Sequence, residues 1–220
     1  MSRYGLFTFL LSVVTFLTVG CTPDGFDNPQ VWCQGCSTAY CIKANPLVHA
    51  GLASLKKFTG SDMRRPGPLS VHLSRDATCG SEVSYENGHI CLGAYERRGE
   101  TADSHANIAY FTAMMGFAAW TEWRIADDAY GEVGELMRYV AMAATNNCPA
   151  TEPGKPCDPC RWLSPSTELR FLEALCASEI RPGQVRSALR KIDQRARDDN
   201  APVGRLVLER ILYDAAGSKP

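Results

Sequence analysis

The stretch from Ser104 to Thr145, SHANIAYFTAMMGFAAWTEWRIADDAYGEVGELMRYVAMAAT, decides the fold that we expect for this chain. Its first half carries apolar residues around most of the helical circumference, which predicts a helix buried on nearly all sides. After a polar break at residues 124–128, a second run places Val133, Leu136, Met137, Val140 and Ala144 at steps of three and four. We therefore expect a buried helix and an amphipathic companion packed against it.

Upstream of this helix pair, the sequence predicts a small sheet at about residues 69–95. The segment 69–73 alternates apolar and polar residues, as a half-buried strand does. Residues 83–85 and 89–92 flank Glu86-Asn87-Gly88, in which Asn and Gly accept the positive φ angles of a tight hairpin turn. These strands predict one small antiparallel β-hairpin sheet.

The remaining elements are expected to be helices. A short helix is predicted to begin after Pro46, because proline is favoured in the first turn. Further helices are expected from Ser164-Pro165, after Pro182-Gly183, and at residues 203–212. The fold class that we expect is therefore α+β, predominantly helical, with a helical body at about residues 104–214.

The length and composition fit one domain, and they favour no particular class of partner. The chain has 220 residues, 23 Lys plus Arg against 24 Asp plus Glu, and a formal net charge of -1. No broad basic field favours nucleic acid as a partner. No Gly-x-Gly-x-x-Gly, phosphate loop or Gly-x-Ser-x-Gly occurs.

The first twenty residues have the pattern of an export signal. Arg3 precedes an uncharged apolar run from Gly5 to Val19, which is short for a membrane span. The run ends in Leu17-Thr18-Val19-Gly20-Cys21, which resembles the lipobox of bacterial lipoproteins. The resemblance covers the export segment alone, and it departs from the family at Thr18, where Leu is commoner. A plain secreted protein is the alternative.

The lipobox resemblance implies an anchor, a location and a domain order. Cys21 would carry the lipid, and the membrane would be a partner through that lipid. Thr22 follows the cysteine instead of Asp, which by analogy favours the outer membrane. We expect a signal peptide at residues 1–20, a Pro- and Gly-containing tether at 21–31, and a single disulfide-rich domain at 32–220.

Ten cysteines in an exported chain predict disulfides, because the cell envelope permits oxidation. Without Cys21 the number is odd, which either counts against lipidation or leaves one free or intermolecular thiol. Cys79 with Cys91 is the pairing that we favour, since the bond would tie the start of the hairpin to its return strand. The connectivity does not follow from sequence. The candidates are Cys33, Cys36, Cys41, Cys79, Cys91, Cys148, Cys157, Cys160 and Cys176.

Two pairs with Cys-x-x-Cys spacing allow alternative interpretations. Cys33 and Cys36 have the spacing of a thioredoxin-like site, but their polar, proline-rich upstream neighbours do not predict the buried strand that such a site follows. Together with Cys157 and Cys160 they would form a zinc ligand set. The missing strand favours a structural disulfide cluster over a redox site, and the long intervening sequence and an oxidising compartment disfavour zinc, so we expect no metal and no cofactor.

The predicted hairpin, loop and buried helix starting near His105 resemble the core of zinc metallopeptidases, over about residues 69–145. That family carries His-Glu-x-x-His on the helix, with the Glu as general base. The aligned stretch here is His105-Ala106-Asn107-Ile108-Ala109. Ala106 replaces the base and Ala109 the second ligand, so the resemblance implies a related scaffold without hydrolysis by that mechanism.

No complete catalytic set emerges. Ser54-Leu55-Lys56-Lys57 matches the Ser-x-x-Lys pattern of β-lactamases, but no Lys-Thr-Gly follows at a useful distance. We expect a non-catalytic envelope lipoprotein with a structural or binding role, whose partner is an envelope or surface protein. A divergent metallopeptidase-like protein and a thiol-disulfide oxidoreductase are the alternatives.

Overall fold

The computed structural model describes residues 25–60, 63, 68–74, 83–93, 102–121, 132–148, 157–162 and 182–198. Within these ranges no helix is both long enough and apolar enough to span a membrane. The export signal, Cys21, and the helices expected at Ser164-Pro165 and at residues 203–212 lie outside the described residues. The elements are β1 (Gln30–Gln34), α1 (Thr38–Thr59), β2 (Ser70–Ser74), β3 (Val83–Glu86), β4 (His89–Gly93), α2 (Ala102–Thr121), α3 (Glu132–Thr145), α4 (Pro159–Trp162) and α6 (Pro182–Asp198).

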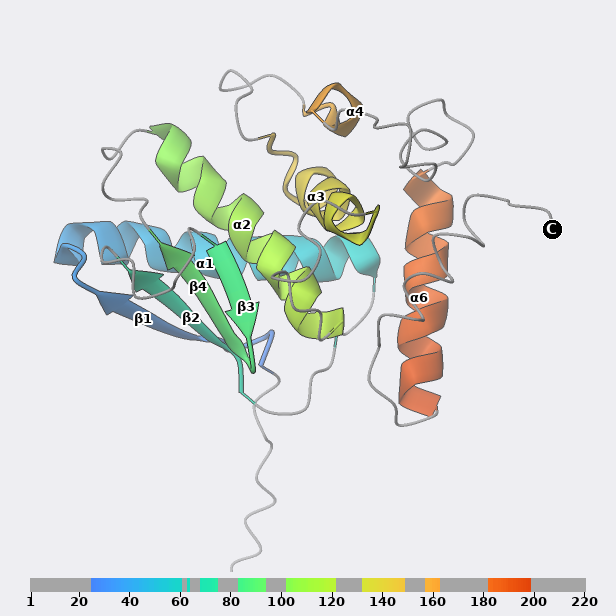
Figure 1. Cartoon of the computed structure of the whole chain (residues 1–220), viewed down its shortest axis with the longest axis horizontal. Coiled ribbons are helices and arrows are strands. Elements are labelled where there is room, and N and C mark those ends of the chain that lie inside the picture. Colours follow the sequence, from blue (N-terminus) through green and yellow to red (C-terminus); the bar gives the residue numbers. More distant parts are fainter. Residues whose placement is uncertain are drawn as a thin grey trace, which may run out of the picture.

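The central helix pair is confirmed. Along α2, residues from all round the helix are buried, among them Ile108, Met115 and Phe117, each with 0% exposure. The apolar side of α3 is buried as well, including Leu136 and Val140. Figure 1 shows α2 crossing α1, with α3 beside α2. These helices form the middle of the hydrophobic core.

The sheet is larger than predicted and mixed in direction. Its strand order is β1-β2-β4-β3, in which β1 pairs parallel with β2, β2 pairs parallel with β4, and only β3 is antiparallel to its neighbour β4. The hairpin turn is confirmed, with φ of 48° at Asn87 and 88° at Gly88. The expectation of a purely antiparallel sheet was wrong, because α1 forms a crossover that lets β1 and β2 run parallel.

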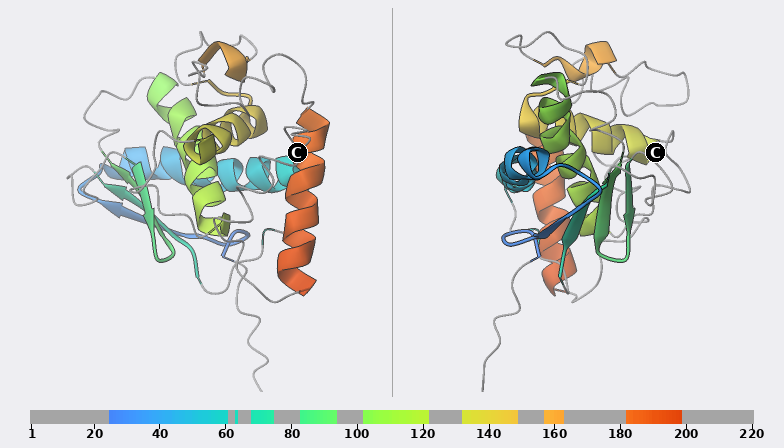
Figure 2. Two further views of the ribbon diagram at one scale, coloured as in Figure 1. Left: turned by 45° about the vertical axis from the view of Figure 1, so that its right-hand side comes forward. Right: turned by 90° about the vertical axis from the view of Figure 1, so that its left-hand side faces the viewer.

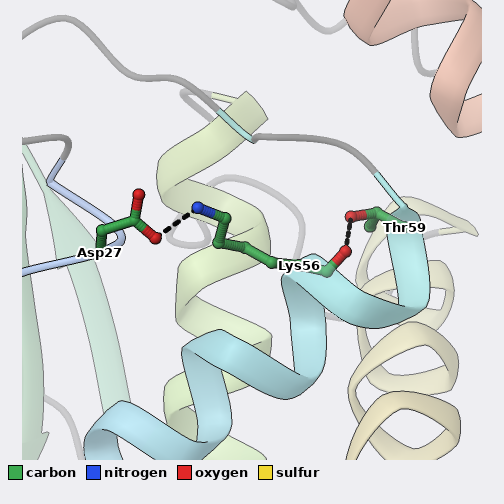
Figure 3. Close-up of polar contacts among 3 residues, drawn as sticks. All are labelled: Asp27, Lys56 and Thr59. Atoms are coloured by element: carbon green, nitrogen blue, oxygen red, sulfur yellow. Dashed lines mark hydrogen bonds and ion pairs between the residues drawn. The ribbon is translucent and has the colours of Figure 1, made fainter.

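Strand β1 begins inside the segment that we expected to be a tether, with its first two residues, Gln30 and Val31. Phe26 is already part of the core, at 3% exposure, and β1 begins at Gln30. Asp27 forms an ion pair with Lys56 of α1, and the Thr59 hydroxyl donates to the Lys56 carbonyl at 3.2 Å (Figure 3). The folded part therefore includes residues 25–31, which precede the start that we predicted at residue 32.

Helix α1 begins one residue after Ser37, well before the predicted start at Pro46. The Ser37 hydroxyl accepts a hydrogen bond from the Tyr40 N–H at 3.2 Å, which is the usual role of a serine cap. Pro46 lies inside the helix. Its ring removes one backbone donor, so the carbonyl of Ile42, four residues earlier, loses its helical partner. Both side chains are exposed, which leaves that carbonyl on the solvent side of the helix.

The C-terminal end of α1 joins the core to α6. Gly60 adopts the left-handed conformation, and its N–H donates to the Lys56 carbonyl at 2.8 Å. Arg190 of α6 donates from Nε to the Thr59 carbonyl at 3.3 Å. A cation at this end also complements the helix dipole. Helix α6 confirms the element predicted after Pro182-Gly183, and Figure 1 shows it at the far end of α1 from the sheet.

Two disulfides connect described residues. Cys33 of β1 is bonded to Cys41 of α1, with Cα atoms 6.2 Å apart, and Cys148 is bonded to Cys157, with Cα atoms 5.2 Å apart. Cys91 and Cys160 are also disulfide-bonded. Cys79 and Cys176 lie outside the described ranges. The pairing of Cys79 with Cys91 therefore stays a prediction.

Candidate binding surface on the sheet

The two faces of the sheet differ in chemistry. One face carries apolar side chains from the central strands, and Val71, Leu73, Ile90 and Leu92 on it are at most 1% exposed. In the right-hand view of Figure 2, α1 and α2 lie on one side of the sheet. Because successive side chains of a strand point to opposite faces, the residues between these apolar ones share the other face. Those residues are largely polar: Gln30, Trp32, Ser70, His72, Ser84, Glu86, His89 and Cys91.

Three residues on this polar face converge on one point. Ser70 of β2 lies opposite His89 of β4 in the register, and His72 follows Ser70 on the same face. The Ser70 hydroxyl oxygen is 2.6 Å from Nδ1 of His89 and 3.2 Å from Nε2 of His72. The two imidazole rings meet edge to face, with centroids 5.7 Å apart. We call Ser70, His72 and His89 the histidine–serine cluster.

Hydrogen bonding restricts how protons can be distributed in the histidine–serine cluster. A serine hydroxyl has a single hydrogen, so Ser70 can donate to only one of the two rings. When both rings are neutral, the other ring must donate its N–H to the Ser70 oxygen. Burial lowers the pKa of His72 below its usual value, and a charge on His89 would lower it further. Protonating both rings would place two positive charges side by side.

Trp32 extends the cluster to the edge of the sheet. It lies beside His72 in the register, and the two rings are nearly parallel, with an interplanar angle of 18° and centroids 6.4 Å apart. Trp32 is 55% exposed. Large aromatic side chains are usually buried in the core or at an interface, so an exposed tryptophan on a rigid strand marks this edge as a candidate contact surface.

The spacing of Ser70 and His89 is that of a nucleophile and a base, but the set is incomplete. A catalytic serine needs a base that is itself oriented by a third group. Glu86 lies opposite His89 in the register of β3 and β4, yet no hydrogen bond joins these two described side chains. Ser70 itself is buried, at 7% exposure. Among the described residues, the cluster therefore lacks the third group that would orient a catalytic base.

The thioredoxin-like interpretation of Cys33 and Cys36 does not match the bonds. A strand does precede the helix, contrary to our expectation, but Cys33 is bonded to Cys41 instead of Cys36. The Cys36 sulfur lies within hydrogen-bond distance of the carbonyl oxygens of Leu73, at 3.5 Å, and Gln34, at 3.6 Å. The bond between Cys33 and Cys41 holds the edge strand to the start of α1, which is a structural role.

The four-cysteine zinc set is not assembled either. Cys33, Cys157 and Cys160 are in disulfides, so they do not offer the thiolates that zinc needs. Across the part of the chain that the structure describes, no three His, Cys, Asp or Glu side chains are grouped closely enough to hold a metal ion.

The other candidate residues lie on α1 and α2. His105 lies in the first turn of α2, and its side chain is outside the described set. Ser54 and Lys57 of the Ser-x-x-Lys pattern lie on α1, and no hydrogen bond joins these two described residues. Trp120 is buried in the core, at 4% exposure.

A second polar cluster lies between α2 and α3. Glu135 accepts from Arg138 at 3.0 Å on its Oε1, whereas its Oε2 is buried with no hydrogen-bond partner in the described structure. Burial raises the pKa of Glu135, which the charge and hydrogen bond of Arg138 oppose. Burial also raises the pKa of Tyr110 to about 12, with Arg138 lowering and Glu135 raising it. We regard this cluster as part of the helix packing.

Comparison with known proteins adds no relative. Neither the protein-family models, nor the curated proteins, nor the solved structures contain a match to the chain. Any functional proposal therefore rests on the residues themselves.

The histidine–serine cluster was missed at the level of sequence. Sequence patterns do not single out His72 and His89, because the two residues lie far apart along the chain and their proximity follows only from the parallel pairing of β2 with β4. One signal was present. Ser70, His72 and His89 are the polar members of two alternating segments, so any pairing that buries the apolar members places all three on one face.

Proposed function

We propose that this chain is a non-catalytic, lipid-anchored protein of the cell envelope that binds another envelope protein through the exposed edge of its sheet. The observation that carries the proposal is Trp32, which is 55% exposed on the edge strand β1. The export pattern and the lipobox-like sequence ending at Cys21 support the location. The occupant that we propose is an extended segment of the partner, added beside β1.

The backbone of β1 supports strand addition. The Gln30 N–H donates to the Leu69 carbonyl at 2.9 Å, so Gln30 faces the neighbouring chain of the sheet. Because backbone groups alternate in direction along a strand, those of Val31 and Cys33 point away from β2. These outward groups have no strand beside them among the described residues. Such an edge is a template for a strand from another chain.

The edge is also held rigid, which favours binding. The Cys33–Cys41 bond fixes β1 to α1, and the Asp27–Lys56 ion pair holds the chain just before the strand. A preorganised edge loses less conformational entropy on binding than a mobile one. Tryptophan is enriched among the residues that contribute most to interface affinity. The anchor at Cys21 would place this edge a short chain length from the membrane.

Lipidation is tested by metabolic labelling of the full-length chain with an alkyne fatty acid. We expect label on the wild-type chain, none on Cys21→Ala, and unchanged label on Cys36→Ala. In membrane fractionation, the wild-type chain and Cys36→Ala should be found with the membranes, and Cys21→Ala should not. An unlabelled wild-type chain, or label that survives Cys21→Ala, contradicts the anchor.

Partner binding is tested by a photo-crosslinking amino acid placed at Gln34 in the full-length chain in cells. Gln34 is exposed on β1, and Ser187, exposed on α6, is the matched control position. We expect a discrete crosslinked protein from position 34, absent from position 187 and reduced by Trp32→Ala. Equal crosslinking from both positions contradicts the edge as the binding surface.

The metallopeptidase-like scaffold is the second candidate. The hairpin of β3 and β4, followed by α2 with His105 in its first turn, supports it. Ala106 and Ala109 replace the other two residues of the motif, so we propose a related scaffold without peptide hydrolysis. Zinc analysis of the purified chain tests it: a bound zinc ion that is lost in His105→Gln supports the candidate, and zinc content independent of His105 contradicts it.

A further inference from the structure

The geometry points to a binding site for a divalent transition-metal ion, Zn²⁺ or Cu²⁺, formed by His72, Ser70 and His89 on the polar face of the sheet. The site adjoins the proposed contact of β1, because Trp32 stacks on His72, but it binds an ion and not a partner chain, so this inference goes beyond the proposed function. It requires only the histidine–serine cluster.

The ring nitrogens of the cluster are aimed at a common point. Nε2 of His72 and Nδ1 of His89 both lie within hydrogen-bond distance of the Ser70 oxygen, at 3.2 and 2.6 Å. The two nitrogens therefore converge from neighbouring strands. Convergent imidazole nitrogens are the arrangement that Zn²⁺ and Cu²⁺ use in proteins, since imidazole suits both ions.

The two distances from the Ser70 oxygen can be compared with those between the ligands of a metal ion. Zn–N bonds are about 2.0–2.1 Å long, so neighbouring ligands of a tetrahedral ion lie about 3.3 Å apart. The Ser70 oxygen is 3.2 Å from one ring nitrogen, close to this value, and 2.6 Å from the other, which needs a shift of a few tenths of an ångström. For an ion to bind above the Ser70 hydroxyl, both imidazole rings must rotate so that their nitrogens face the ion instead of the hydroxyl. A water molecule would complete the tetrahedron.

The cluster is accessible from solvent. His89 is exposed and His72 is half-buried, whereas Ser70 is buried beneath them. Both rings can therefore turn toward an ion arriving from solvent, while the serine forms the floor of the site. The rings stand on two strands joined by ladder hydrogen bonds, which keeps their Cα atoms at a fixed separation. A rigid base reduces the entropy that two imidazoles lose on chelation.

Trp32 supplies a fluorescence signal close to the proposed metal site. Its ring centroid is 6.4 Å from that of His72, so a Cu²⁺ ion on Nε2 of His72 would be close enough to quench the fluorescence of Trp32. The test is titration of the purified full-length chain in detergent with CuCl₂ or ZnCl₂, followed by calorimetry and by tryptophan fluorescence. We expect one saturable site per chain and partial quenching by Cu²⁺. Trp32→Phe should lose that quenching and keep the stoichiometry.

Variants assign the ligands. His89→Gln and His72→Gln should each weaken binding by at least about tenfold, as loss of an ordering group at a metal site does. Ser70→Ala should weaken it less. His49→Gln is the matched control, because His49 lies half-buried on α1, and it should bind as the wild type does. Thermal unfolding in the presence of a chelator checks that each variant is folded.

The same variants distinguish this site from a metal site elsewhere in the chain. His89 is exposed, so His89→Gln is not expected to disturb folding and decides the question even if another variant fails to fold. Wild-type affinity in folded His89→Gln overturns the inference, as does the absence of saturable binding. Binding that is lost in His105→Gln but kept in His89→Gln assigns the ion to α2 and overturns it too.

Discussion

Gly51 of α1 lies directly against the backbone of Ala109 on α2. A Cβ atom at position 51 would be 2.5 Å from the Ala109 carbonyl oxygen and 3.1 Å from Cβ of Thr112. On the other helix, a Cβ at Gly116 would be 2.6 Å from Cδ2 of Leu52. The two helices therefore approach each other where both lack side chains, and this close crossing sets the position of α2 against the rest of the core.

Gly51→Ala is predicted to destabilise the protein. The new methyl group meets a carbonyl oxygen that cannot move without displacing α2, and overpacking of this kind costs about 1–3 kcal/mol. Gly183→Ala is the matched control, because position 183 has open space around it on α6. Chemical denaturation should show a lower midpoint for Gly51→Ala alone. Equal midpoints for the two variants would mean that α1 and α2 do not cross as closely as these distances require.

Thr112→Val is predicted to leave stability unchanged or to raise it by about 1 kcal/mol. The Thr112 hydroxyl oxygen is buried with no hydrogen-bond partner among the described residues. Removing an unsatisfied buried polar atom while keeping the side-chain shape recovers its desolvation cost. The measurement is the free energy of unfolding, with Thr121→Val as control. Thr121 donates to the Phe117 carbonyl at 2.9 Å, so its replacement should be destabilising.

Glu135 is predicted to make stability fall as the pH rises. Burial raises its folded-state pKa above the usual value of a glutamate, so the folded chain binds this proton more tightly than the unfolded chain does. The contribution to stability is therefore complete below the unfolded pKa, and it is lost as the pH rises through the raised folded pKa. Glu135→Gln should reduce this fall in the free energy of unfolding with rising pH. Unfolding measured at several pH values from about 4 upward tests the slope, since a free glutamate titrates near that pH. An unchanged slope contradicts the assignment.

The two described disulfides are predicted to contribute comparably to the free energy of unfolding. Their sequence separations are 8 and 9 residues, which in the chain-entropy picture correspond to about 2–3 kcal/mol each. Paired Cys→Ser changes at 33 and 41, and separately at 148 and 157, should each lower the free energy of unfolding by that order. A loss confined to one pair would show that the other loop is already ordered without its crosslink.

Reduction is predicted to act first on the N-terminal half. The sheet edge is held to α1 by the Cys33–Cys41 bond, whereas α2 and α3 are packed through apolar side chains. Reductant should therefore increase proteolysis mainly before Ser104 while much of the helical circular-dichroism signal persists.

Alkylation of the unreduced mature chain should label at most one cysteine. Three or more labelled cysteines would contradict extensive disulfide bonding.

The sequence predicted the elements whose pattern is local. The α2–α3 pair follows from apolar spacing, and the turn between β3 and β4 follows from Asn87-Gly88. It did not predict β1, because four of the five residues of this strand are exposed and their pattern lacks an apolar face. That strand is held by the Cys33–Cys41 disulfide and by parallel pairing with β2. We predicted that α1 begins after Pro46. The helix instead begins next to the Ser37 cap, so Pro46 lies inside it.

The candidate site depends on long-range pairing and was therefore harder to find. Trp32, His72 and His89 come from three strands, and nothing in their sequence spacing shows that β1, β2 and β4 are adjacent in that order. Periodicity shows which residues share a face of one strand, but not which strands are neighbours. A purely antiparallel sheet, as we expected, would not include β1 at all.

The parallel pairing of β1 with β2 has a consequence for the kinetics of folding. Val31 pairs with Val71 across the whole of α1, so forming this contact closes a long loop of the chain. The Cys33–Cys41 bond shortens that path by only its own small loop. Crosslinking therefore holds the finished edge in place without bringing the two strands together sooner. The rate-limiting event in refolding should be the docking of β1 onto β2, and it should proceed at a similar rate whether or not that bond has already formed.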